Sequence, residues 1–217
     1  MRSFGKMVLA FGLVALSTVP AMAQGRGGFG FGMGGGPMLL SNKGVQQELK
    51  VTDAQAEKLD TLAQELGQKQ REEFGKLQDV PQDERREKMQ ELSRSINEEM
   101  QKSLNGILKS EQTKRFQQIQ LQQAGVNAFS TPRVEKELEL TADQKSKIRL
   151  INEDLAESTR EAFRGGQSDR AAAMQKITQL RKEGLEKATA LLTDDQKKSW
   201  KDLTGEPFEV KFERRPQ

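Results

Sequence analysis

The hydrophobic residues of this chain recur at steps of three and four positions, which is the spacing of one face of an α-helix. This pattern predicts a long helix over residues 53–77, with an apolar stripe formed by Leu59, Leu62, Ala63, Leu66, Phe74 and Leu77. The pattern resumes with Met89, Leu92, Ile96, Met100, Leu104 and Ile107. Pro81 suits the first turn of this second helix, so the two helices should form a hairpin.

The same plan recurs in the second half of the chain. A break near Gly106 precedes a short helix that carries Phe116 and Ile119. Later, the pattern predicts helices over residues 143–164, 168–191 and 194–203, with a stop at Gly165 and Gly166. We therefore expect an all-α fold of two helical hairpins, each followed by a short third helix. The apolar and polar residues alternate over 208–212, so residues 206–217 are expected to form an extended tail lying on the helices.

An internal duplication accounts for this symmetry. Residues 134–144 repeat the pattern of residues 45–55, with Thr141 following Thr52 by 89 positions. A second block matches at an offset of 84, from Gln112 to Gln196. We take residues 43–126 and 127–205 as the two copies. They are expected to cover each other's apolar stripes, which contain Leu59, Leu62 and Leu66 in the first copy and Ile148, Ile151 and Leu155 in the second.

The duplicated Thr-x-x-Gln words are typical of helix starts. In such a capping box the threonine hydroxyl accepts from an early helical N–H, and the glutamine side chain accepts from the N–H of the threonine. The three boxes are formed by Thr52 with Gln55, Thr141 with Gln144, and Thr193 with Gln196. Each cap should contribute about 1 kcal/mol to helix stability. Residues 108–112 lack the threonine, and Ser110 is expected to cap there instead.

The first residues resemble an export signal. Residues 1–6 are basic, residues 7–16 are apolar but short for a membrane span, and Ala21 and Ala23 are small residues of the kind a signal peptidase requires. We expect residues 1–23 to be a Sec-type signal peptide that is cleaved after Ala23, leaving no stable membrane anchor. Since the chain has no Cys, a bacterial periplasm or a similar exported space is the expected location.

A glycine-rich segment follows the signal. Residues 24–42 carry little continuous apolar surface to offset the entropy of ordering, so they are expected to form a flexible arm. The arm is either a plain spacer or a tether whose apolar side chains contact partners. The side chains that could do so are Phe29, Phe31, Met33 and Met38.

Composition excludes several kinds of chemistry. The chain has neither Cys nor His, which removes thiolate and imidazole nucleophiles and the usual zinc and copper ligands. We expect no enzyme activity, no cofactor and no metal site, because carboxylates and Met33, Met38, Met89, Met100 and Met174 are spaced as helix faces, core or linker. Without Arg2 and Lys6, the 35 basic residues fall to 33 against 32 acidic ones. This near-neutral balance argues against nucleic-acid binding.

The repeated boxes carry a family resemblance. An exported helical chain with Leu-Thr-x-x-Gln words at 140–144 and 192–196, and variants at 51–55 and 108–112, resembles the Spy/CpxP-related periplasmic family. The resemblance implies an ATP-independent chaperone or an envelope-stress adaptor, built in the family from hairpins that dimerise into a curved cradle. Two copies in one chain suggest that a monomer supplies both halves of that cradle. The near-neutral charge differs from the basic concave face expected in the family.

Two trios of residues are candidates for binding clients. Arg71, Glu72 and Phe74 lie near the end of the first long helix, and Arg160, Glu161 and Phe163 lie at the equivalent place in the second copy. Apolar side chains beside cations could hold an unfolding exported protein weakly. Alternatively, both phenylalanines belong to the core at the ends of the hairpins. The rival function is an adaptor that docks on one folded partner, such as a periplasmic sensor domain, or a structural helical spacer.

Overall fold

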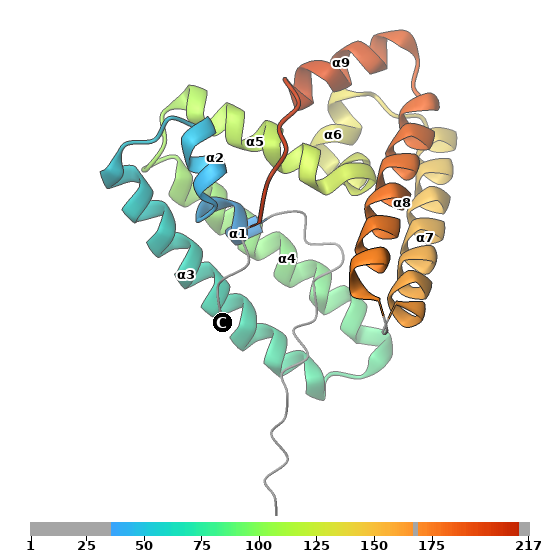
Figure 1. Ribbon diagram of the computed structural model, residues 1–217, viewed down its shortest axis with the longest axis horizontal. Coiled ribbons are helices and arrows are strands. Elements are labelled where there is room, and N and C mark those ends of the chain that lie inside the picture. Colours follow the sequence, from blue (N-terminus) through green and yellow to red (C-terminus); the bar gives the residue numbers. More distant parts are fainter. Residues whose placement is uncertain (1–35, 167–168, 213–217) are drawn as a thin grey trace, which may run out of the picture.

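The computed structural model describes residues 36–166 and 169–212, and within these residues the chain is helical with no strand. The all-α prediction is confirmed. The expected signal peptide at 1–23, most of the glycine-rich arm and the last five residues lie outside the described residues. Figure 1 shows two helical hairpins joined by a helix that crosses between them.

The first half is a hairpin with two short helices packed on it. Its elements are α1 (Gly36–Leu40), α2 (Lys43–Glu48), α3 (Asp53–Lys76), the 3₁₀ turn η1 (Leu77–Asp79), α4 (Gln82–Leu104) and α5 (Ser110–Ala124). The long helices α3 and α4 run antiparallel, and α1 lies against α3. Pro81 occupies the N-cap position of α4, one residue before the first turn in which it was expected.

The second half follows the same order of elements. It contains the 3₁₀ helix η2 (Gly125–Ser130), α6 (Pro132–Glu137), α7 (Ala142–Gly165), α8 (Arg170–Ala190) and α9 (Asp194–Thr204), so α6 to α9 repeat the order of α2 to α5. Helices α7 and α8 form the second hairpin. The two first long helices, α3 and α7, each have 24 residues, and α4 and α8 have 23 and 21.

The three expected capping boxes are present at the starts of α3, α7 and α9. In each box the threonine Oγ1 accepts from the glutamine N–H, and the glutamine Oε1 accepts from the threonine N–H. The expectation for Ser110 is wrong, because Lys109 occupies the N-cap position of α5. A lysine side chain has no acceptor, so only the Oε1 of Gln112 acts there, accepting from the Lys109 N–H at 2.9 Å.

The entries to α3 and α7 share an unusual backbone turn. Lys50 and Glu139 both have φ of 50°, in the left-handed region that residues with a side chain seldom adopt. The Lys50 N–H donates to the Gln47 carbonyl, and the N–H of the following residue donates to the Gln46 carbonyl. In the second copy the Glu139 N–H donates to the Lys136 carbonyl, and the next N–H donates to the Glu135 carbonyl. This pair of bonds is the Schellman motif that ends a helix. It places each following threonine at its cap.

The hydrophobic core is divided in two, contrary to the expectation that the copies cover each other's stripes. One cluster contains Leu59, Leu62 and Leu66 with α1, α2, α4 and α5. The other contains Ile148, with Ile151 and Leu155 packed against it, and is completed by η2, α6, α8 and α9. Each half therefore buries its long helices with its own short helices.

Helix α5 and the C-terminal tail connect the two clusters. Phe116 and Ile119 of α5 lie in the first cluster, whereas Leu121 packs against the second. The tail leaves α9 at Gly205 and runs without regular secondary structure along α5, where the Gln122 Nε2 donates to the carbonyls of Thr204 and Glu206. Its Phe208 and Val210 pack on the first cluster, so the last residues of the second half complete the first.

The flexible arm expected over residues 24–42 is contradicted at its C-terminal end, the part that the structure describes. Residues 36–40 form α1, and Leu39 and Leu40 are buried in the first cluster. Two adjacent leucines at the end of the glycine run supply enough apolar area to fix the backbone there. Met38, on the other side of α1, is 69% exposed.

Candidate interaction surface

The glutamines of the capping boxes meet in pairs. In the first half, the Gln55 Nε2 donates to the Gln112 Oε1 at 2.9 Å and to the Ile107 carbonyl at 2.8 Å. The Gln112 Nε2 donates in return to the Leu49 carbonyl at 3.1 Å. We call this pair the first glutamine clasp; it ties the start of α3 to the start of α5.

The second half has an equivalent clasp. The Gln144 Nε2 donates to the Gln196 Oε1 at 2.7 Å and to the Leu191 carbonyl at 2.9 Å. The Gln196 Nε2 donates to the Leu138 carbonyl, also at 2.9 Å. Sequence reasoning identified these glutamines as caps but missed that they pair. The signal was that the word occurs twice in each half, at residues 51–55 and 108–112 in the first and at residues 140–144 and 192–196 in the second. The clasps use all the polar atoms of these side chains, which makes them structural.

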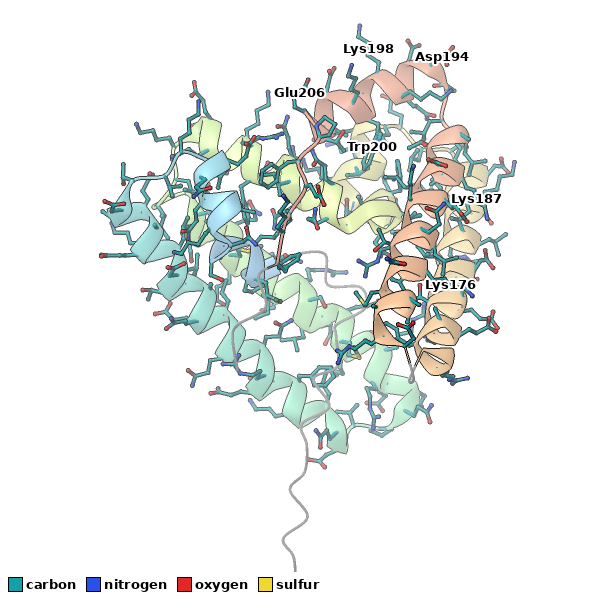
Figure 2. The ribbon with its side chains drawn as sticks, in the orientation of Figure 1. Lys176, Lys187, Asp194, Lys198, Trp200 and Glu206 are labelled. Atoms are coloured by element: carbon teal, nitrogen blue, oxygen red, sulfur yellow. The ribbon has the colours of Figure 1, made fainter. Side chains whose placement is uncertain are left out.

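The aromatic ring of α9 also serves the fold. Trp200 projects from the inner side of α9 (Figure 2), and its ring stacks on Phe129 with centroids 4.3 Å apart. Lys176 and Lys187 of α8 and Lys198 of α9 extend into solvent in the same view. The apolar side of α9 is therefore occupied by the second cluster.

The far end of the first hairpin is different. Between residues 71 and 92, which we call the tip of the first hairpin, every side chain is exposed or half-buried. Phe74 is 48% exposed and Met89 is 38% exposed, although both occupy positions of the helical stripe. Leu77, Val80 and Leu92 are half-buried. The stripe continues past the point where the short helices cover it, so apolar surface is left open.

Two of the lysines at the tip form ion pairs with nearby glutamates. The Lys76 Nζ lies 2.6 Å from the Glu73 carboxylate and Lys88 lies 3.1 Å from Glu91. The hydrogen bond from Lys76 to Glu73, strengthened by the carboxylate charge, raises the pKa of Lys76, and Glu91 raises the pKa of Lys88 in the same way. Arg71 is exposed and makes no hydrogen bond or ion pair to another described residue.

The two candidate trios have different surroundings. Arg71 and Arg160 are both exposed, but Phe163 is half-buried whereas Phe74 is open. The second hairpin closes with small residues: Ala162 and Ala173 are buried, and a Cβ on Gly166 would lie 2.2 Å from the Cβ of Ala173. Moreover, α3 and α7 bury their apolar side chains in separate clusters. The structure therefore does not bring the trios into one site.

Chemical sites are not evident in the part of the chain that the structure describes. Among those residues, no group of three or more acidic side chains lies close enough to hold a metal ion. None of the described helices combines the length and the apolar character needed to cross a bilayer. Comparison with family models, with curated proteins and with solved structures finds no match to this chain.

Proposed function

We propose that this protein is an exported, ATP-independent chaperone-like or envelope-stress protein that binds unfolding proteins reversibly. The proposal draws on the resemblance of its repeated boxes to the Spy/CpxP-related family. The observation that carries it is the tip of the first hairpin, where Phe74 and Met89 remain exposed on an otherwise charged helical pair. An unfolding client exposes apolar segments that could contact these side chains.

Binding at such a surface would be weak and reversible. The apolar area at the tip is limited to two well-exposed side chains and three half-buried ones. The tip carries five basic and seven acidic residues between positions 71 and 92, so its net charge is slightly negative and long-range attraction would favour basic rather than acidic clients. The sequence contains no Gly-x-x-x-x-Gly-Lys phosphate loop, and the proposed cycle uses no nucleotide.

The proposal keeps a cradle made by one chain, but its two hairpins do not share a core. The two hairpins have matching element order, which supports a common origin. Because their cores are separate, only α5 and the tail would hold the hairpins in a fixed relation. We propose that the protein acts as a monomer and that the first tip is the main contact surface.

The decisive experiment measures how the wild type, a tip variant and a control variant affect the aggregation of two client proteins. Aggregation of two unrelated unfolding proteins is followed by light scattering with the intact protein at near-stoichiometric ratio and no ATP. We expect the wild type to delay both aggregations and Phe74→Ser with Met89→Ser to lose most of this effect, because the apolar contact is removed. Leu150→Ser is the matched control, since Leu150 is 56% exposed on α7, away from the tip.

Circular dichroism and melting of each variant separate binding from folding. All three proteins should melt alike, because none of the changed side chains is buried. If the wild type delays neither aggregation, the chaperone proposal is wrong. If it delays both and the tip variant does so equally well, the activity resides elsewhere on the molecule.

The second candidate is an adaptor that docks on one folded partner, such as a periplasmic sensor domain. The fixed ion pairs at the tip favour it, because a defined charge pattern suits a single complementary surface. An adaptor would ignore both denatured clients in the scattering assay. It would instead show saturable binding to one folded exported protein, reduced by the same tip variant.

A further inference from the structure

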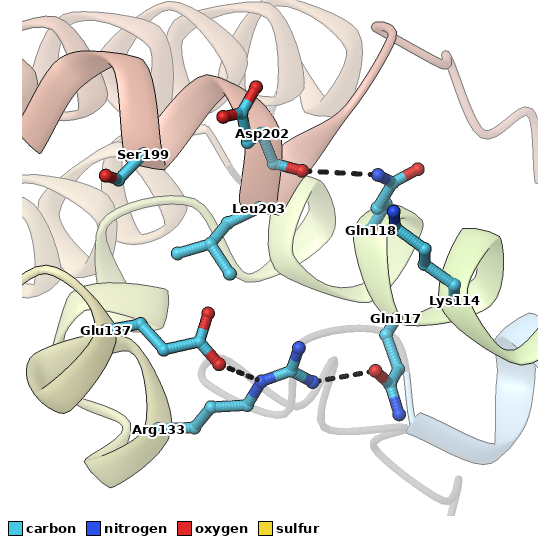
Figure 3. A pocket seen from close by; sticks show the side chains of 8 residues that line it. All are labelled: Lys114, Gln117, Gln118, Arg133, Glu137, Ser199, Asp202 and Leu203. Atoms are coloured by element: carbon cyan, nitrogen blue, oxygen red, sulfur yellow. Dashed lines mark hydrogen bonds and ion pairs between the residues drawn. The ribbon is translucent and has the colours of Figure 1, made fainter.

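A hollow lies where the two halves of the molecule meet, remote from the tip of the first hairpin. Its volume is about 340 Å³, and α5, α6 and α9 each contribute to its walls. The lining residues are Lys114, Gln117, Gln118, Arg133, Glu137, Ser199, Asp202 and Leu203 (Figure 3). This volume lies at the lower end of the range for small-molecule sites.

The guanidinium of Arg133 is held in one orientation at the floor of the hollow. Its Nε donates to the Glu137 carboxylate at 3.0 Å, and its Nη1 donates to the Gln117 Oε1 at 2.7 Å. The remaining nitrogen, Nη2, makes no hydrogen bond within the described residues and points into the hollow (Figure 3). A guanidinium fixed on two sides presents its last N–H groups without further loss of freedom.

The other walls complement this donor. Lys114 stands on the α5 side and makes no hydrogen bond or ion pair to another described residue. Leu203 extends into the hollow and supplies an apolar wall, and Ser199 adds a hydroxyl. The Asp202 carboxylate points away from the hollow, and only its carbonyl turns inward, accepting from the Gln118 Nε2 at 3.3 Å.

The lining residues carry two cations and two carboxylates, of which the Asp202 carboxylate points away from the hollow (Figure 3). Glu137 neutralises Arg133 through their ion pair, and Lys114 has no such partner. An incoming anion would meet the open edge of Arg133 and the ammonium of Lys114. Carboxylates suit both donors, because their two oxygens can accept from guanidinium N–H groups that lie in one plane. Inorganic anions would leave the wall formed by Leu203 without a contact.

We propose that this hollow binds an organic carboxylate with a compact apolar body. Such a group occurs both in a short branched carboxylic acid and at the C-terminal residue of a peptide ending in a leucine-like side chain. The carboxylate would lie against Arg133 and Lys114, and the apolar body against Leu203. This site is independent of the proposed client surface, because no residue of the tip lines it.

Calorimetric titration of the intact protein tests the site, with four probes. These are N-acetyl-Ala-Ala-Leu with a free carboxylate, the same peptide as its C-terminal amide, isovalerate, and inorganic phosphate. We expect the free peptide to bind with a Kd of about 1 mM or below, as a few charge-assisted bonds and one apolar contact allow. The amide should bind at least about tenfold more weakly, because it offers no anion to the two cations. Isovalerate binding as tightly as the peptide would identify the free acid as sufficient.

Variants assign the binding to the hollow. Arg133→Gln and Lys114→Gln should each weaken binding of the free peptide by about tenfold. Arg133→Lys keeps the charge but removes the planar fork, and it should restore only part of the affinity. Lys198→Gln is the control: it removes an equal charge from α9, but its side chain points away from the hollow (Figure 2) and should leave binding unchanged.

Three outcomes would overturn the proposal. The first is no heat of binding for the free peptide or isovalerate up to about 10 mM, well above the expected Kd. The second is equal binding of the peptide and its amide, or of phosphate and the peptide, which would show that no organic carboxylate is recognised. The third is equal loss in Lys198→Gln and Arg133→Gln. Circular dichroism of each variant confirms that the helices are intact.

Discussion

Individual glutamines hold this fold at four helix starts. Each one accepts a backbone N–H at its own cap and donates to a carbonyl at the end of a different segment. A capping box ordinarily serves only its own helix. Here the side-chain amide has a second set of partners, so the cap of one helix also fixes its neighbour. Gln144 is only 8% exposed, so water could not replace its hydrogen bonds if they were lost.

Removal of Gln144 should cost more than the loss of a cap. We expect Gln144→Ala to lower the free energy of unfolding by about 2 kcal/mol, because a cap bond and buried bonds to Leu191 and Gln196 are lost together. Urea unfolding followed by circular dichroism measures this change. The control is Gln68→Ala, whose side chain bonds only to Glu72 on the exposed side of α3 and should change little.

The pair can also be tested as a unit. The double variant Gln144→Ala with Gln196→Ala should lower the free energy of unfolding by less than the sum of the two single changes. The reason is that each single change leaves the amide of its partner without one of its hydrogen bonds. Strict additivity would show that the two amides do not depend on each other.

At the scale of elements, the short helices α2 and α6 are each followed by a non-glycine residue whose backbone is in the left-handed conformation. Lys50 and Glu139 hold this conformation between α2 and α3 and between α6 and α7. Glycine is the usual residue at this position of a Schellman motif. The equal placement of the two turns fixes where each long helix starts. It also sets the distance from each turn to its glutamine clasp.

A glycine at this turn should behave unlike a glycine inside a helix. We expect Lys50→Gly to leave stability unchanged or to raise it by up to about 1 kcal/mol, because the strained φ of 50° is relieved. Lys58→Gly, on the exposed side of α3, should lower stability by about 1 kcal/mol through helix propensity. Thermal unfolding of both variants provides the comparison. An equal loss in both would contradict the role assigned to the turn.

At the scale of the whole molecule, charge is spread over the surface and the core is thin. Two clusters of apolar side chains, joined by α5 and the tail, replace a single large core. The ion pairs lie at the surface, for example Lys76 with Glu73 and Lys88 with Glu91. Such exposed pairs contribute little to stability. The fold therefore depends on the short helices, caps and clasps that close each cluster.

Stability should vary little around neutral pH. The sequence has no His and no Cys, so apart from the α-amino group no side chain has its ordinary pKa between about 5 and 8. We expect the melting temperature to be constant between pH 6 and pH 8, as measured by circular dichroism. A shift of several degrees in this range would show that a carboxyl or lysine titrates far from its ordinary pKa.

Stability should fall slightly at alkaline pH. The pKa values of Lys76 and Lys88 are raised by their carboxylate partners. Their stabilising contribution is therefore present below the unfolded value of 10.5 and is lost as the pH rises through the folded value. Both pairs lie at the surface in contact with solvent, so the loss should be small and should be abolished by high salt.

The sequence by itself determined the long helices and the capped starts of α3, α7 and α9. Steps of three and four residues define an α-helix, and the Thr-x-x-Gln words act within one turn of chain, so neither depends on distant contacts. For the same reason the turns at Pro81 and at Gly165 could be read directly. The apolar stripe of α3 was also evident, although its pattern did not show that Leu66 is buried and Phe74 is open.

Only the tertiary structure decided what covers each stripe. The periodicity of a helix shows which face is apolar, but it does not show which partner lies on that face. The separate clusters, the pairing of Gln55 with Gln112, and the tail over α5 all join residues far apart in the chain. The hollow around Arg133 arises in the same way, because its walls come from three helices. Contacts of this kind follow from packing, which local sequence does not encode.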